Sequence, residues 1–232
     1  MKNKKIFSLY LPKSALFLWI LSLVIITVSF FIFEGDNYLS LCSSLLGITS
    51  VIYCAKGNPF GHVIGIIFCI IYAIISLTYT YYGELITYLG MTMPMAIISL
   101  IAWIKNPYKD NAPEVKVNHI KLRELIFALL LSTIVTVAFY FILRAFGTAN
   151  LIISTVSVTT SFIAVYLTFR RSPFYAIAYA INDIVLMVLW ALATLENLSY
   201  LSVVICFFTF LIIDIYGFIS WIKMDAQQKI EK

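Results

Sequence analysis

Charged residues are scarce in this sequence. Asp, Glu, Lys and Arg make up 12% of its 232 residues, whereas 62% of the residues are hydrophobic. In soluble domains, roughly a quarter of the residues are charged and about half are apolar. So little charge cannot cover a water-soluble surface, which excludes a soluble fold and predicts an all-α, polytopic membrane protein.

Patterns that bind metals or phosphates, or that carry out acyl transfer, are also missing. The four cysteines and two histidines show no CxxC or Cys/His spacing, so neither a disulfide framework nor a metal site is predicted. No GxxxxGK[ST], HExxH or GxSxG pattern occurs. We therefore expect no cofactor, no enzymatic activity and no ATP-driven pumping by this chain alone.

Long apolar runs fill most of the chain. A spanning helix needs about 20 apolar residues, because the hydrocarbon layer is about 30 Å thick and each residue rises about 1.5 Å. The first run is too long for a signal-peptide core and lacks a small-residue cleavage site, so we interpret it as a retained helix. Eight spans are predicted at 14–33, 38–55, 60–82, 84–104, 123–146, 150–169, 173–194 and 198–222.

The positions of Lys and Arg predict the orientation of these spans. Basic residues gather in the cytoplasmic loops of membrane proteins, and with eight spans every Lys and Arg except Arg144 falls on one side. We therefore expect a protein of the cell membrane with both termini in the cytoplasm, and we assign the net charge of +5 to topology rather than to nucleic-acid binding. The loops on the opposite side carry Glu34, Asp36, Glu84 and Glu196.

Short matches in the first half of the sequence recur in the same order in the second half. Each block holds three spans and one span connects the blocks, so the two blocks have the same orientation. Parallel repeats of this kind occur in transporters that bind their substrate near the membrane midplane. The matching pairs are Thr49-Ser50 with Thr160-Ser161, Pro59-Phe60 with Pro173-Phe174, Glu84 with Glu196, and Trp103-Ile104-Lys105 with Trp221-Ile222-Lys223.

This organisation divides the chain into five segments. The first span lies outside the repeat, and its expected role is that of a peripheral anchor or an oligomer contact. The segments are a cytoplasmic N-terminus with an accessory helix (1–37), a first three-helix bundle (38–104), a cytoplasmic loop with a connector helix (105–149), a second three-helix bundle (150–222) and a cytoplasmic tail (223–232).

Asp183 and Asp214 lie deep in the predicted spans. A carboxylate inside a bilayer costs about 2.5–3.5 kcal/mol on insertion scales, so such residues face a bundle interior or a water-filled cavity. Tyr179, Asn182 and Trp190 share a helix face with Asp183, because they are spaced by three, four and seven residues. These five residues either bind a flat, partly polar cation by stacking, hydrogen bonding and charge, or hydrogen-bond and pack between helices.

Several other features have structural interpretations. A GxxxG pattern at 61–65 permits close approach of two helices. Pro94 predicts a kink in the fourth span. We expect a structural role for His62, and we expect Trp103 and Trp221 to anchor their spans at the membrane interface.

Five stretches carry a resemblance to a known family. They are Asn58–Gly65, Tyr81–Thr92, Phe169–Tyr175, Tyr179–Leu186 and Asp214–Trp221. They resemble the PnuC-type vitamin transporters, also called nicotinamide riboside or nicotinamide mononucleotide transporters, over nearly the whole chain. The resemblance implies a 3+1+3 core like that of the SWEET sugar carriers, a homotrimer, and facilitated diffusion of a vitamin that phosphorylation then traps in the cell.

The substrate implied by the resemblance is nicotinamide riboside, an aromatic cation that would suit Asp183. Many family members carry a Trp-x-x-Trp pair where this chain has Ala176 and Tyr179. Thiamine, riboflavin and deoxynucleosides therefore remain alternatives. Two unpaired carboxylates in the spans also leave proton-coupled import open. A membrane sensor or an assembly subunit that transports nothing is the alternative outside the transporters.

Overall fold

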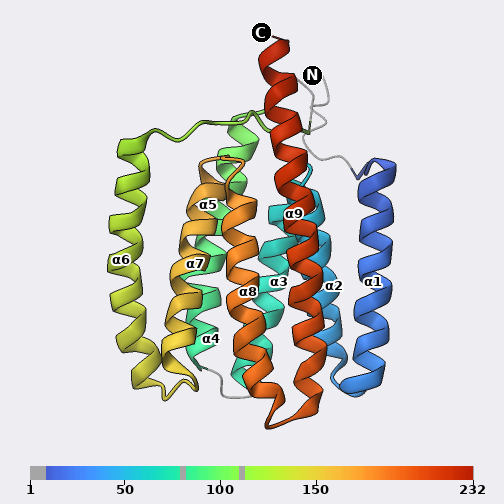
Figure 1. Cartoon of the computed structure of the whole chain (residues 1–232), viewed down its shortest axis with the longest axis vertical. Coiled ribbons are helices and arrows are strands. Elements are labelled where there is room, and N and C mark those ends of the chain that lie inside the picture. Colours follow the sequence, from blue (N-terminus) through green and yellow to red (C-terminus); the bar gives the residue numbers. More distant parts are fainter. Residues whose placement is uncertain (1–8, 79–81, 110–112, 232) are drawn as a thin grey trace.

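A computed structural model describes residues 9–78, 82–109 and 113–231, and these form a bundle of helices (Figure 1). Within these ranges, the pairing of extended backbone is confined to an isolated bridge between Pro107 and Val115. The helices are α1 (Lys13–Phe33), α2 (Tyr38–Cys54), α3 (Phe60–Thr78), α4 (Tyr82–Thr87), α5 (Met93–Lys105), α6 (Leu122–Ala145), α7 (Leu151–Phe169), α8 (Tyr175–Thr194) and α9 (Leu201–Ile230), with a π-helical turn η1 (Tyr88–Thr92) and a 3-10 turn η2 (Leu198–Tyr200).

Seven of the described segments are long and apolar enough to cross a membrane, with mean hydropathies between 1.8 and 2.8. The helix α2 is apolar but shorter, with 17 residues, which is the lower limit of a membrane span. Large apolar side chains such as Phe17, Val24, Phe127 and Ile134 are exposed on α1 and α6. Apolar surfaces of this extent mark contact with a membrane, so the chain is a multi-pass membrane protein.

Basic side chains gather at one end of the bundle, which we call the basic end. It holds the C-terminal end of α9 and the α2–α3 and α7–α8 turns (Figure 1). Its described basic residues are Lys13, Lys56, Lys105, Lys109, Lys116, Lys121, Arg123, Arg170, Arg171, Lys223 and Lys229. The opposite, acidic end holds Glu34, Asp36 and Glu196, together with Arg144. Of the remaining predicted topology signals, Lys2, Lys4, Lys5 and Lys232 lie outside the described residues, and Glu84 lies in α4 with its side chain outside the description.

The helices pack in two groups of three. In the first group α3 lies between α2 and α5, and in the second group α8 lies between α7 and α9. The groups meet where α2 packs on α9 and where α5 packs on α7. The remaining long helices are peripheral, since α6 packs on α7 and α1 packs on α2 and α9 (Figure 1).

The fourth predicted span is not one regular helix. The π-helical turn η1 separates α4 from α5, and Pro94 follows it in the first turn of α5. Proline has no N–H to donate to a preceding carbonyl, which explains why the regular hydrogen bonding changes here. The structure therefore places an interruption where the sequence predicts a kink.

The last predicted span ends too early, at 222. The helix α9 continues to Ile230, so the described part of the predicted cytoplasmic tail (223–232) is helical. Lys229 forms an ion pair with Asp225 one turn earlier (2.7 Å), and such pairs support exposed helical turns. The third predicted span, 60–82, ends in the described structure at Thr78, and residues 79–81 lie outside it.

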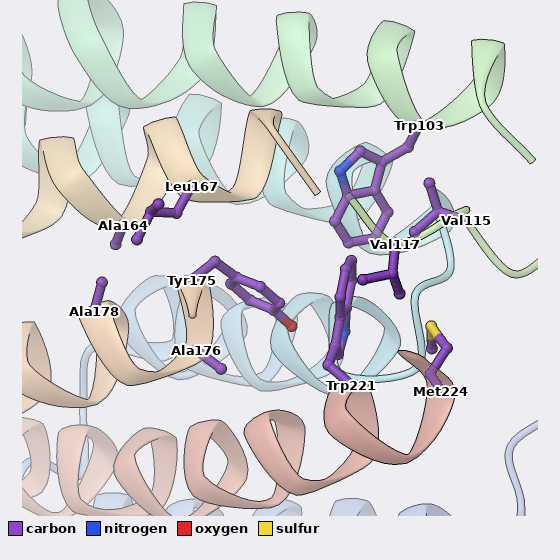
Figure 2. Packing of buried hydrophobic residues seen from close by; sticks show 10 residues of the cluster. All are labelled: Trp103, Val115, Val117, Ala164, Leu167, Tyr175, Ala176, Ala178, Trp221 and Met224. Carbon is purple, nitrogen blue, oxygen red and sulfur yellow. The ribbon is translucent and has the colours of Figure 1, made fainter. Parts of the chain in front are cut away.

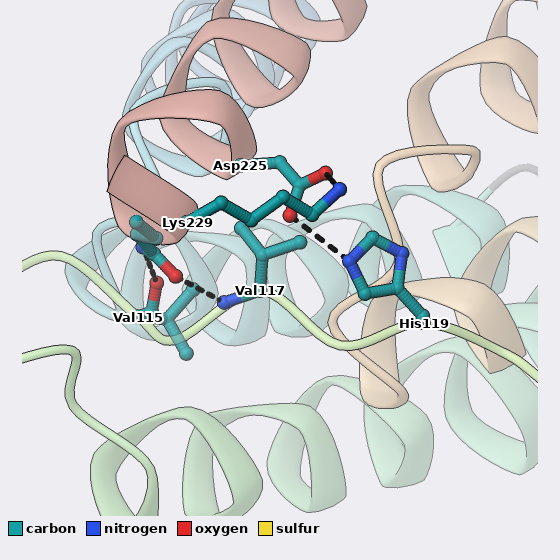
Figure 3. A network of polar contacts seen from close by, with 6 residues as sticks. Val115, Val117, His119, Asp225 and Lys229 are labelled. Carbon is teal, nitrogen blue, oxygen red and sulfur yellow. Dashed lines mark hydrogen bonds and ion pairs between the residues drawn. The ribbon is translucent and has the colours of Figure 1, made fainter. Parts of the chain in front are cut away.

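A polar network fastens the end of α9 to the loop between α5 and α6 (Figure 3). The Gln228 side chain accepts a hydrogen bond from the Val117 N–H (2.9 Å) and donates one to the Val115 carbonyl (3.0 Å). Asp225 contacts His119 of the same loop at 3.0 Å. These contacts hold residues 115–119 across the basic end of the bundle.

The α2–α3 and α7–α8 turns share their geometry. Gly57 and Arg171 each adopt a left-handed backbone conformation, with φ of 65° and 58°, two residues before a proline. The Val115 N–H donates to the Gly57 carbonyl, and the Asn118 N–H donates to the Arg171 carbonyl, both at 3.0 Å. Residues 115–119 therefore connect equivalent points of the two helix groups.

The helices α2 and α3 approach each other closely at Gly61. A Cβ atom at this position would lie 2.7 Å from the Ser50 carbonyl oxygen and 2.8 Å from the Cys54 backbone nitrogen. Backbone atoms cannot move aside as a side-chain end can. The close approach predicted from the GxxxG pattern is confirmed at this glycine.

We predict that Gly61→Ala destabilises the protein by about 1–3 kcal/mol, because an added methyl group overpacks a tight contact. Gly90→Ala is the matched control, since a Cβ there would lie 3.8 Å from Ile86, an ordinary contact distance. Thermal unfolding in detergent should show a lower midpoint for Gly61→Ala alone. Equal midpoints for the two variants would contradict the packing described here.

Candidate functional site

A cavity of about 590 Å³ lies between the two helix groups. Its lining comes from α2, α3, η1 and α5 on one side and from α7, α8 and α9 on the other. At the acidic end the lining includes the exposed loop residues Asp36 and Asn197, so the cavity is open on that side. Its volume is typical of small-ligand sites, which measure about 300–1,000 Å³.

All five residues predicted from the sequence as site residues line this cavity: Tyr179, Asn182, Asp183, Trp190 and Asp214. The first four project from α8 and the last from the adjacent helix α9. Trp190 packs against Tyr200 nearer the open end, with ring centroids 5.3 Å apart. Helical spacing therefore located one wall of the cavity correctly.

The two buried carboxyl groups lie within hydrogen-bonding reach of each other. Asp183 and Asp214 are 4% and 3% exposed, and their side chains form a hydrogen bond. Two carboxyl groups in such contact share a proton, since two adjacent negative charges repel strongly. The pair therefore places two acidic groups side by side on the cavity wall, where a cationic ligand could reach them.

Asn182 makes a contact between helices. The Thr160 hydroxyl of α7 donates to the Asn182 side-chain oxygen at 2.7 Å. The side-chain oxygen of Asn182 therefore holds two helices together, while the residue also lines the cavity.

Three residues on the lining carry buried side-chain atoms that have no hydrogen-bond partner among the described residues. They are the Ser43 hydroxyl, Nε2 of His62 and Oδ2 of Asp183. Buried polar atoms are paired in most proteins, and an unpaired one costs about 1–3 kcal/mol. This arrangement leaves polar groups around the cavity that a ligand or a change of conformation could satisfy.

The first helix group contributes residues that the sequence did not single out. Phe68 and Tyr88 form an aromatic wall, with ring centroids 5.7 Å apart, and both line the cavity. His62, expected to be structural, also lies on the lining. The signal that could have identified these residues is the repeat, since a site between two halves must draw on both.

The charge of the lining is one-sided. Its carboxylates are Glu34 and Asp36 at the open end and Asp183 and Asp214 at depth, and the described lining includes no Lys or Arg. Burial raises the pKa of the Glu34 carboxyl, and a hydrogen bond donated by Ser202 (3.0 Å) offsets part of this rise. Clefts lined by one sign of charge attract ligands of the opposite sign, so this cavity favours cations.

At the basic end the cavity stops at Trp103 and Trp221, which we call the tryptophan seal (Figure 2). The two side chains are 1% and 0% exposed, with ring centroids 5.3 Å apart. The prediction that they anchor their helices at the membrane interface is wrong, because both rings are buried in the bundle. Tyr175 packs on Trp221 and His62 on Trp103, with centroids 5.1 and 4.3 Å apart.

The seal is held by hydrogen bonds that cross between the helix groups. Trp103 of the first group donates to the Thr168 carbonyl of the second at 2.8 Å. Trp221 of the second group donates to the Cys54 carbonyl of the first at 3.0 Å. Cys54 and Thr168 are equivalent, since each lies five residues before the proline of its turn.

In the part of the chain that the structure describes, no group of His, Cys, Asp or Glu side chains could hold a metal ion. The lining offers carboxyl groups, hydrogen-bonding side chains and aromatic rings to a ligand.

Comparisons with known proteins agree with this architecture. A crystal structure of the vitamin B3 transporter PnuC superposes with a TM-score of 0.79 over 94% of each chain, at 24% sequence identity. The nicotinamide riboside transporter PnuC of Neisseria mucosa is 26% identical over 235 residues, which cover 96% of this chain and 89% of that protein. The protein of the same name from Haemophilus influenzae is 21% identical, over 89% of this chain and 88% of its own length.

A family model described as nicotinamide mononucleotide transporter matches residues 37–223. The match begins at the N-terminus of α2 and ends within α9, so it contains both helix groups and the whole cavity except for Glu34 and Asp36. The chain therefore belongs to the nicotinamide mononucleotide transporter family.

Proposed function

We propose that this protein carries nicotinamide riboside across the cell membrane by facilitated diffusion. The observation that carries the proposal is a cavity with four carboxylates, aromatic walls and, in its described lining, no Lys or Arg. Nicotinamide riboside is a pyridinium cation with a flat ring, so the acidic pair Asp183 and Asp214 suits its charge and the ring of Tyr179 suits its flat shape. Two relatives that bear this substrate in their names support the assignment.

The same lining favours the riboside over the mononucleotide. A phosphate group is normally bound by Arg, Lys or the N-terminus of a helix. The carboxylates of this cavity would repel the phosphate of the mononucleotide, and no basic side chain of the described lining would offset that repulsion. The nucleoside is therefore the better fit, although the family model has the name of the nucleotide.

Matched features of the two helix groups support a 3+1+3 core of parallel repeats like that of the SWEET carriers, to which the accessory first helix adds an eighth span. The middle helix has the same place in each group, the turns share their left-handed residues, and the tryptophan hydrogen bonds are equivalent. In this plan α6 is the connector and α1 an accessory helix outside the family match. The segments 1–37, 38–104, 105–149, 150–222 and 223–232 remain the proposed division, with helical structure extending into the last.

The basic end is proposed to face the cytoplasm, because cytoplasmic loops are enriched in Lys and Arg. The cavity would then be open to the outside in this structure. A homotrimer and trapping of the imported vitamin by phosphorylation are further parts of the proposal, and the resemblance to PnuC-type transporters supports them.

Proton-coupled import is the second candidate, favoured by the hydrogen bond between Asp183 and Asp214. A pair that shares a proton could release it when a cation binds. Facilitated diffusion and coupling differ in their response to a pH gradient.

Uptake into liposomes that contain only this protein tests the function. Labelled nicotinamide riboside, its mononucleotide, thiamine and riboflavin are offered separately, with and without an imposed pH gradient. We expect saturable uptake of the riboside that does not respond to the gradient. Uptake driven by the gradient would favour proton coupling, thiamine uptake would correct the substrate, and no uptake of any label would indicate a sensor or an assembly subunit.

Replacing Asp183 tests the cation site. We predict that Asp183→Asn weakens half-saturation for the riboside by about tenfold or more, since hydrogen bonds and charge contacts to ionised groups contribute about 1.5–3 kcal/mol. Glu196→Gln is the matched control, because Glu196 is exposed and is not part of the lining. Initial uptake rates across a range of riboside concentrations give the half-saturation constant of each variant. Equal constants for Asp183→Asn and Glu196→Gln would remove Asp183 from the site.

A further inference from the structure

The tryptophan seal separates the cavity from the basic end. The last lining residues on that side are Cys54, His62, Thr168 and Tyr175, and each contacts one of the two tryptophans by a hydrogen bond or by ring packing. A solute that enters at the acidic end therefore meets two buried indole rings before it can leave. Passage requires these rings to part.

We propose that the tryptophan seal is the gate of the transport path at the basic end, and that it opens when its two crossed hydrogen bonds break together. Each bond joins one helix group to the other, so neither tryptophan can keep its partner if the groups rotate apart. Because the two bonds are equivalent, a single rotation of one group against the other releases both. The proposal rests on the transport function proposed above.

A second layer lies outside the seal. Val115 and Val117 of the α5–α6 loop pack on the cluster that contains both tryptophans (Figure 2). The same loop bonds to Gly57 of one helix group and, through Asn118, to Arg171 of the other. If the groups rotate apart, at least one of these bonds must also break, so the loop strengthens the closed state.

The closed state has a built-in cost. Nε2 of His62 is buried without a hydrogen-bond partner in the described structure while the ring packs edge-on against Trp103. An unpaired buried nitrogen disfavours the conformation that holds it. The seal is therefore balanced between stabilising crossed bonds and an unsatisfied group, as a gate that must open repeatedly requires.

Thiol labelling measures the gate directly. The single-cysteine protein keeps Cys54, which lines the cavity beside the seal, and replaces Cys42, Cys69 and Cys206 with serine. In membrane vesicles of known orientation, a membrane-impermeant maleimide is added on one side at a time. Trp103→Phe and Trp221→Phe each remove one N–H donor and keep an aromatic ring.

We expect each variant to label about two- to tenfold faster than the parent from the basic end, because one net hydrogen bond of the closed state is lost. Labelling from the acidic end should slow, because the population with an open seal grows at the expense of the population with a closed seal. Trp19→Phe is the matched control: it also removes a tryptophan hydrogen bond, to Thr49 at 3.1 Å, but outside the seal.

Parental labelling rates in both seal variants, or the same rates as in Trp19→Phe, would overturn the gate. Faster labelling from both sides at once would also overturn it, because that pattern indicates local unfolding rather than gating. No substrate is present in this experiment, so its result is independent of which vitamin the protein carries. Uptake of thiamine in place of the riboside, together with a positive labelling result, would refute the substrate and leave the gate in place.

Discussion

Polar groups inside a membrane have no water to bond to, and this constraint organises the whole protein. The lipid-facing surfaces of α1 and α6 expose large apolar side chains, and the two carboxyl groups deep in the spans lie on the cavity between the helix groups. Asp183 and Asp214 can exist at this depth because they face a cavity and each other. The cost of charge in hydrocarbon thus explains why the cavity between the helix groups suits a polar solute.

Polar contacts that join the two helix groups gather at the basic end. There the indole N–H groups of Trp103 and Trp221 bond across the interface, and residues 115–119 bind both turns. At the acidic end the same groups are separated by the mouth of the cavity. This asymmetry explains how one bundle can be stable and still contain a path that is closed on one side only.

The sequence predicted most of the architecture because hydropathy and charge act over whole spans. Apart from the C-terminal end of α9, helix limits agree to within a few residues, and the α8 face with Tyr179 and Asp183 does line the cavity. Periodicity shows which residues share a face, but it does not show which helix that face meets. For this reason Trp103 and Trp221 resembled interface anchors, and Phe68 and Tyr88 were missed among uniformly apolar residues. The extension of α9 was missed because its polar turns are stabilised by contacts of Gln228 with a distant loop.

The central claim is that a cationic vitamin binds between the helix groups beside Asp183 while the tryptophan seal is closed. An experimental structure of the protein with nicotinamide riboside tests it most directly. The account predicts the pyridinium ring within contact of Asp183 and Tyr179, on the cavity side of Trp103 and Trp221. A ligand bound elsewhere in the bundle, or one held without either of these residues, would contradict it.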